Sequence, residues 1–98
     1  MLNINSKEWF EDFGEFVRKA RMEKEIPQWK LGEELGMTQA YISHIERGER
    51  VVDLFLAFRI CDKLNVDIRE FLTPYIDEAE DVKVEVEVEL ESEVEEKR

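Results

Sequence analysis

Residues 28–47 constrain the fold of this chain more than any other segment. Their apolar side chains recur every three or four residues on both sides of Gly36, which is the spacing of two short amphipathic helices. Gly36 can take the left-handed conformation that ends a helix, and Thr38 carries a hydroxyl that can cap the next one. Gly32 is the smallest residue available where two steeply crossing helices meet. The shared apolar seam consists of Leu31, Leu35, Met37, Ile42 and Ile45. The segment therefore predicts a helix, a tight turn and a second helix.

Three further helices are expected around this segment, over residues 6–25, 54–64 and 68–73. Asp53 is suited to cap the second of them, and Pro74 lacks the N–H that would continue the third. A chain of 98 residues is one domain, and its core is small enough that a partner would help to stabilise it. The fold class is therefore all-α, with five helices.

Residues 82–90 differ in kind, because valine or leucine alternates strictly with a charged residue, which is the period of a β-strand. Val84, Val86 and Val88 would share one face. No second strand is predicted, so we expect this strand to pair with its copy in a second chain. The alternative is a disordered acidic tail. We therefore divide the chain into a helical domain at 1–76 and an acidic extension at 77–98 that serves as a dimerisation strand.

The charge is uneven along the chain. The net charge is −11, of which residues 77–98 carry −8 and residues 1–76 only −3. A local basic cluster survives within residues 18–30, consisting of Arg18, Lys19, Arg21, Lys24 and Lys30. Nucleic acid is therefore not excluded as a partner of the helical domain, despite the acidic total.

Several common classes of protein are disfavoured by composition. One Cys and one His exclude an intramolecular disulfide and the usual zinc clusters, so no enzyme activity, metal or cofactor is expected. No apolar run approaches the roughly 18 residues of a membrane span, and no signal peptide precedes the polar start. We expect a soluble, cytoplasmic protein with no membrane contact.

Several short stretches of the sequence match one known pattern at the same spacing. They are Gln28, Gly36-Met37-Thr38 and residues 41–48 and 64–67. From Phe13 to about Leu72, and without a gap, the sequence resembles the phage-repressor helix-turn-helix family that includes Cro and lambda repressor. The resemblance implies a five-helix, lambda-repressor-like DNA-binding domain over 1–76. Matches at many positions over about 60 residues make it much more specific than a bare helix-turn-helix pattern.

The resemblance also implies roles for individual residues. Residues 38–47 would be the recognition helix, which enters the major groove by its N-terminal end. Gln39 would read a base edge, and Ala40 would pack on a thymine methyl. Arg21 and Glu46 match a salt bridge between the first and third helices. The residues expected to bind DNA are Gln28, Thr38 and Arg47 at phosphate-binding positions, together with Lys30, Gln39, Ala40, Ser43 and His44.

The sequence departs from the family pattern at a few positions. Pro27 replaces the usual hydroxyl N-cap, so this helix start loses a side-chain acceptor. The loop at residues 49–50 is less basic than in many relatives, which weakens the case for contacts to the DNA backbone there. Phe55 and Leu56 stand where the family geometry points outward, so we assign them, with the valine face of the extension, to a dimer or partner surface.

The function expected from these features is a transcription regulator that binds double-stranded operator DNA, a repressor acting as a homodimer. Its two recognition helices would lie in half-sites about 34 Å apart. Two alternatives remain open. An antitoxin would also capture a basic toxin through the acidic tail. A protein-interaction module would have kept the fold without binding DNA, in keeping with the acidic net charge.

Overall fold

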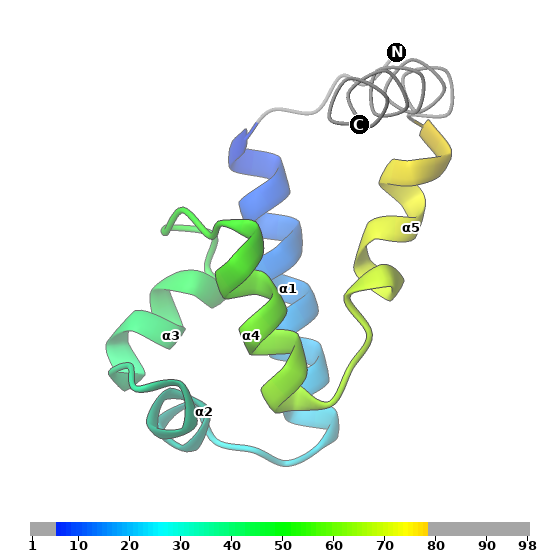
Figure 1. Cartoon of the computed structure of the whole chain (residues 1–98). Coiled ribbons are helices and arrows are strands. Elements are labelled where there is room, and N and C mark those ends of the chain that lie inside the picture. The colour runs from blue at the N-terminus through cyan, green and yellow to red at the C-terminus, as the bar shows by residue number, and fades with distance from the viewer. Residues whose placement is uncertain (1–5, 79–98) are drawn as a thin grey trace, which may run out of the picture. The chain divides into compact units, whose positions relative to one another are not determined.

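The computed structural model describes residues 6–78, which contain five α-helices. They are α1 (Ser6–Glu23), α2 (Gln28–Leu35), α3 (Gln39–Glu46), α4 (Leu54–Leu64) and α5 (Ile68–Glu78) (Figure 1). The prediction of an all-helical fold with five helices is thus confirmed for this part of the chain. The strand expected at residues 82–90, which includes Val84, Val86 and Val88, lies outside the described residues.

Residues Ile4–Phe71 form one compact unit that holds α1 to α4 and the start of α5, while the rest of α5 belongs to a second unit. Pro74 lies inside α5, so the prediction that it ends this helix is wrong. Proline fixes φ near a helical value and removes one backbone donor, and this helix continues past that single lost hydrogen bond. Among the described residues, no helix is both long and apolar enough to cross a membrane.

The starts of α3 and α4 agree with the sequence. The Thr38 hydroxyl accepts a hydrogen bond from the Tyr41 N–H at 3.1 Å, and the Asp53 carboxylate accepts one from the Leu56 N–H at 2.8 Å. Both bonds satisfy a donor that a helix start otherwise leaves unpaired. Pro27 precedes α2 in extended conformation and makes no such bond, as expected.

The first four helices end alike, because a left-handed residue turns the chain and the next N–H reaches back five residues to a helix carbonyl. The left-handed residues are Glu25, Gly36, Gly48 and Asn65. Gly36 confirms the predicted end of α2. The first helix ends at Glu23, slightly earlier than predicted, because the chain already turns at Glu25.

The core of the Ile4–Phe71 unit collects apolar side chains from all its helices. The most deeply buried are Phe13, Val17, Leu31, Ile42, Ile45, Ile60 and Leu64. At the start of α5, the Phe71 ring packs against Trp9 and Phe13, with centroids 5.0 and 5.2 Å apart. These aromatic contacts tie α5 to α1.

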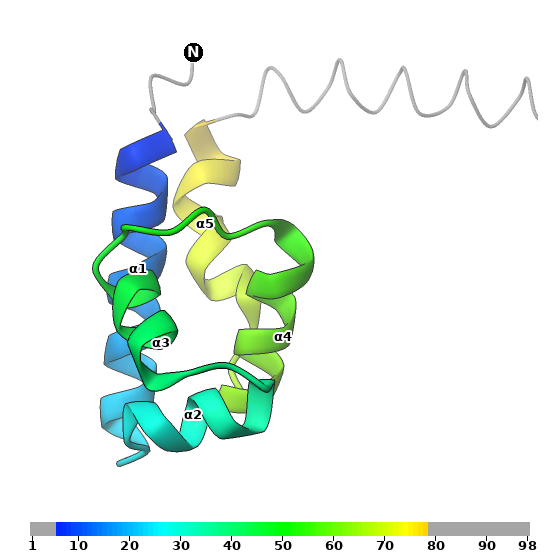
Figure 2. The ribbon, with the colours of Figure 1, turned by 90° about the vertical axis from the view of Figure 1, so that its left-hand side faces the viewer.

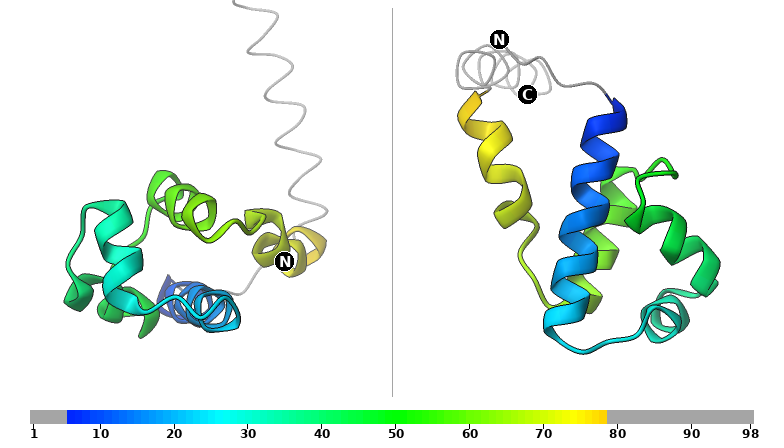
Figure 3. Two further views of the ribbon diagram at one scale, coloured as in Figure 1. Left: turned by 90° about the horizontal axis from the view of Figure 1, so that it is seen from below. Right: turned by 180° about the vertical axis from the view of Figure 1, so that it is seen from behind.

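Two glycines allow α3 and its turn to lie very close to neighbouring backbone. A Cβ on Gly14 of α1 would lie 2.4 Å from the Ile45 carbonyl oxygen, and a Cβ on Gly32 would lie 2.6 Å from that of Met37. Figure 2 shows α3 in front of α1, with α2 running below α3. From behind, α2 and α3 extend to one side of α1 (Figure 3, right). The backbone of α3 and of the turn before it therefore packs closely against α1 and α2.

Candidate nucleic-acid interface

The outer face of α3 is built of small and hydrogen-bonding side chains. Ile42 and Ile45 point inward and are buried against α1 and α2. The residues left at the surface include Gln39 and Ala40, which are exposed, and Ser43 and His44, which are half-buried. The acidic residue of this helix, Glu46, is buried. No carboxylate of α3 itself therefore opposes an approaching polyanion.

Gln39 occupies the first turn of α3, directly after the Thr38 cap. No side chain or backbone group among the described residues hydrogen-bonds its amide. An exposed amide offers a donor and an acceptor side by side. The position thus presents a complete hydrogen-bonding group at the N-terminal end of the helix.

The ion pair implied by the resemblance joins α1 to the end of α3. Arg21 Nε donates to Glu46 Oε2 at 2.7 Å, and Arg21 Nη2 donates to Oε1 at 3.0 Å. The third guanidinium nitrogen donates to the Ile26 carbonyl at 2.8 Å. Both side chains are largely buried, with exposed fractions of 11% and 3%. A buried pair with two parallel hydrogen bonds fixes the orientation of the two helices.

Gln28, at the start of α2, belongs to the same network. Its side-chain nitrogen donates to Glu46 Oε1 at 3.1 Å. The resemblance implies a phosphate contact at this position, but the amide nitrogen here has a partner inside the protein. Only the remaining groups of Gln28 are available to an external ligand, so its first role in this structure is to satisfy the buried carboxylate.

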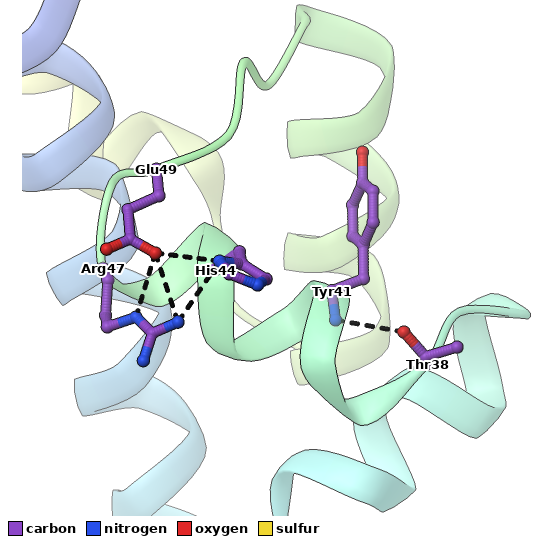
Figure 4. Close-up of polar contacts among 5 residues, drawn as sticks. All are labelled: Thr38, Tyr41, His44, Arg47 and Glu49. Atoms are coloured by element: carbon purple, nitrogen blue, oxygen red, sulfur yellow. Dashed lines mark hydrogen bonds and ion pairs between the residues drawn. The ribbon is translucent and has the colours of Figure 1, made fainter.

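At the C-terminal end of α3, the side chains of His44 and Arg47 converge on one carboxylate oxygen of Glu49 (Figure 4). His44 Nδ1 lies 2.8 Å from Glu49 Oε1, and Arg47 Nε donates to the same oxygen at 3.2 Å. Arg47 Nη2 lies 3.2 Å from His44 Nδ1. The hydrogen bond from His44, together with the positive charge of Arg47, holds the pKa of the Glu49 carboxyl below its ordinary value.

Sequence reasoning missed this role of Glu49 and treated it only as making the loop less basic. A signal for the contact is present in the sequence. Gly48 ends α3 in the left-handed conformation, and this motif places the residue after the glycine beside the helix residue five positions earlier. Here those two residues are Glu49 and His44.

Other cationic groups are exposed on the elements before and after α3. Lys30 of α2 and Arg18 and Lys19 of α1 are exposed. Arg50 lies over the Tyr41 ring, with its guanidinium carbon 4.8 Å from the centroid. This contact holds the Arg50 guanidinium beside α3, and no ion pair within residues 6–78 neutralises its charge.

The N-terminal part of α4 exposes large apolar side chains. Phe55 is 74% exposed, as expected, whereas Leu56 is half-buried. Leu54 and Phe58 are also exposed, at 67% and 59%, although an apolar residue on a helix is more often buried. Because so much exposed aromatic surface is unusual on a monomer, this region is a candidate protein contact. Val84, Val86 and Val88 of the expected dimer surface lie outside the described residues.

Comparison with known families decides the assignment of the fold. A family model described as helix-turn-helix matches residues 17–71. The chain belongs to the Cro and lambda-repressor type of helix-turn-helix family. This confirms the resemblance noted in the sequence. The matched residues include α2, α3 and the turn between them.

Two solved structures are similar to the chain. The restriction-modification controller protein C.AhdI from Aeromonas hydrophila has a TM-score of 0.63 and 26% identity, covering 69% of this chain and 99% of that one. The clp gene regulator ClgR from Corynebacterium glutamicum has a TM-score of 0.63 and 22% identity, covering 95% and 93%. The second likeness shows the fold alone. A search of curated proteins found no match.

Proposed function

We propose that this protein is a transcription regulator that binds specific sequences of double-stranded DNA, and that it acts as a homodimeric repressor in the cytoplasm, without enzyme activity or cofactor. The observation that carries the proposal is the outer face of α3, which reaches the surface and carries no carboxylate from α3 itself, because Glu46 is buried. An α-helix fits the major groove, where base edges present distinct donors and acceptors. The similar protein C.AhdI is a restriction-modification controller, and this likeness supports a regulatory role.

In this proposal, Gln39 and Ala40 read sequence. The Gln39 amide is unengaged and lies in the first turn of α3, the part of a recognition helix that reaches base edges. A glutamine can make two hydrogen bonds to adenine, and the Ala40 methyl can pack against a thymine methyl. Ser43 and His44 lie one turn further along the same side. Discrimination is thus concentrated at the start of α3.

Contacts to the DNA backbone come from the groups around α3. Thr38 caps the start of α3, Arg47 caps its end, and Lys30 belongs to α2. All three are exposed. Such contacts set register and affinity but carry no sequence information. Two copies of the site, in half-sites about 34 Å apart, would give a symmetric operator. The exposed Phe55 region of α4 is the proposed contact between copies.

The test begins with selection of bound duplexes from a random pool, which reports binding and half-site spacing together. Gln39→Ala should lose discrimination at one base pair, worth about 1–3 kcal/mol. Arg47→Ala should weaken all sequences alike and lower the salt slope by about one. Arg69→Ala is a matched charge control, because Arg69 of α5 is 82% exposed and pairs with Asp67, which precedes that helix. If the Gln39 and Arg47 variants bind every duplex as the parent does, the site assignment is wrong.

One observation favours a second candidate, a protein-interaction module. Leu54, Phe55 and Phe58 expose a large apolar area, and the net charge of −11 opposes DNA. A salt series separates the two functions. Binding that weakens steeply with salt supports the regulator, whereas no duplex binding even at low salt supports the module.

A further inference from the structure

Glu49 occupies the cationic end of the proposed DNA-binding face. Its Oε1 atom accepts from Arg47 Nε at 3.2 Å and lies 2.8 Å from His44 Nδ1 (Figure 4). The 2.8 Å contact with a carboxylate requires a proton on Nδ1, so His44 donates there and its approach to Arg47 is proximity only. A single carboxylate oxygen of Glu49 therefore accepts hydrogen bonds from both His44 and Arg47.

The two groups held by Glu49 lie on the side of α3 proposed to face DNA. One row along the helix contains Ala40, His44 and Arg47, because residues four or three positions apart are neighbours on a helix surface. Arg47 is 56% exposed, so its guanidinium can reach an external anion once it is released. Arginine recognises carboxylates and phosphates by the same planar set of donors.

The backbone places Glu49 in this position. The Gly48 N–H donates to the Ile45 carbonyl at 3.0 Å, and the Glu49 N–H donates to the His44 carbonyl at 2.9 Å. Gly48 has φ +75°, and a Cβ there would lie 2.6 Å from the Glu11 side chain. Two hydrogen bonds therefore stabilise this turn, which packs against α1. The turn places the Glu49 side chain next to His44.

From these contacts, and on the basis of the proposed function, we propose that Glu49 is an internal competitor for the DNA phosphate. Its carboxylate occupies Arg47 and His44 in the free protein, and a duplex must displace it to engage them. The resulting penalty is the same for every sequence, because every duplex presents phosphates. Glu49 thereby lowers the affinity of the protein for every duplex. Stable binding then requires the additional contacts to bases at the start of α3.

The experiment compares the parent with Glu49→Gln, Arg47→Ala and the double variant, with Glu70→Gln as control. Glu70 is an exposed carboxylate on α5, so its removal changes the net charge equally. Each protein is titrated with a duplex selected by the parent and with a scrambled duplex of the same composition, from about 50 to about 200 mM salt. Thermal unfolding establishes that every variant is folded.

At the lowest salt, Glu49→Gln should bind both duplexes about five- to tenfold more tightly than the parent, and its salt slope should steepen by about one. Glu70→Gln should change affinity by less than about twofold, because Glu70 is an exposed residue of α5 that holds neither Arg47 nor His44. In the Arg47→Ala background, the gain from Glu49→Gln should shrink to about twofold, since the arginine it would release is gone.

Four outcomes would overturn the proposal. A gain confined to the selected duplex would mean that Glu49 opposes a base and not a phosphate. A gain that persists in full without Arg47 would mean simple repulsion by the carboxylate. If Arg47→Ala weakens binding but Glu49→Gln behaves as Glu70→Gln does, the proposed function stands and this inference alone fails. If no protein binds any duplex at the lowest salt, both fall.

Discussion

Gly14→Ala should destabilise the protein, although the same change in most helices stabilises. Gly14 lies inside α1, where alanine gains about 1 kcal/mol over glycine in helix propensity. The added Cβ would lie 2.4 and 2.5 Å from the carbonyl oxygens of Ile45 and Glu46, whereas ordinary contacts begin at about 3.4 Å. The helices α1 and α3 would therefore have to separate by about 1 Å.

The magnitude follows from what the methyl meets. The backbone of a neighbouring helix cannot rotate away as a flexible side chain can. The loss in the free energy of unfolding should therefore be at the upper end of the range for overpacked cores, about 3 kcal/mol. Subtracting the propensity gain leaves a net loss of about 2 kcal/mol in the free energy of unfolding. For a domain of this size, that corresponds to a fall in Tm of about 8–16 °C.

Chemical and thermal unfolding followed by circular dichroism would measure the loss. Glu15→Ala is the matched control, because Glu15 is the exposed neighbour on the same helix and should change stability by less than about 0.5 kcal/mol. Gly36→Ala tests the opposite situation, since a Cβ there meets nothing within 4 Å but φ is +70°, and should cost about 1 kcal/mol. A Gly14→Ala protein as stable as the parent would refute the close approach of α1 and α3.

Three further changes test other parts of the fold. Arg21→Met leaves the buried Glu46 carboxylate without its ion pair and should cost about 3–5 kcal/mol in urea unfolding; a loss below about 1 kcal/mol would contradict a buried pair. Glu25→Gly relieves a left-handed residue at φ +56° and should raise stability by about 0.5–1 kcal/mol, so a lower Tm would count against it. Burial raises the pKa of the Cys61 thiol from 9.0 to about 11. The folded state therefore favours the neutral thiol. Its contribution to the free energy of unfolding is complete below pH 9.0 and is lost as pH rises through about 11. The parent should thus lose more stability between these pH values than Cys61→Ala does, and equal losses would show that the thiol is not responsible.

The helices and most of their ends could be predicted from the sequence, because they depend on neighbours within a few residues. Thr38 and Asp53 cap α3 and α4 through their own side chains, and Gly36 ends α2 through its freedom to take positive φ. Pro74 shows the limit of this reasoning, since a local rule favoured a stop and the helix continues.

For the candidate site, the sequence by itself determined which side chains α3 carries and which of them its period turns outward. The tertiary structure decided what those side chains touch: the Gln28 amide bonds Glu46, Arg47 is held by Glu49, and Gly14 leaves room for the end of α3. Helix period and capping are set by short-range geometry and can be read along the chain. Contacts between helices depend on where two distant backbones come to rest, and that is fixed only when the whole core packs.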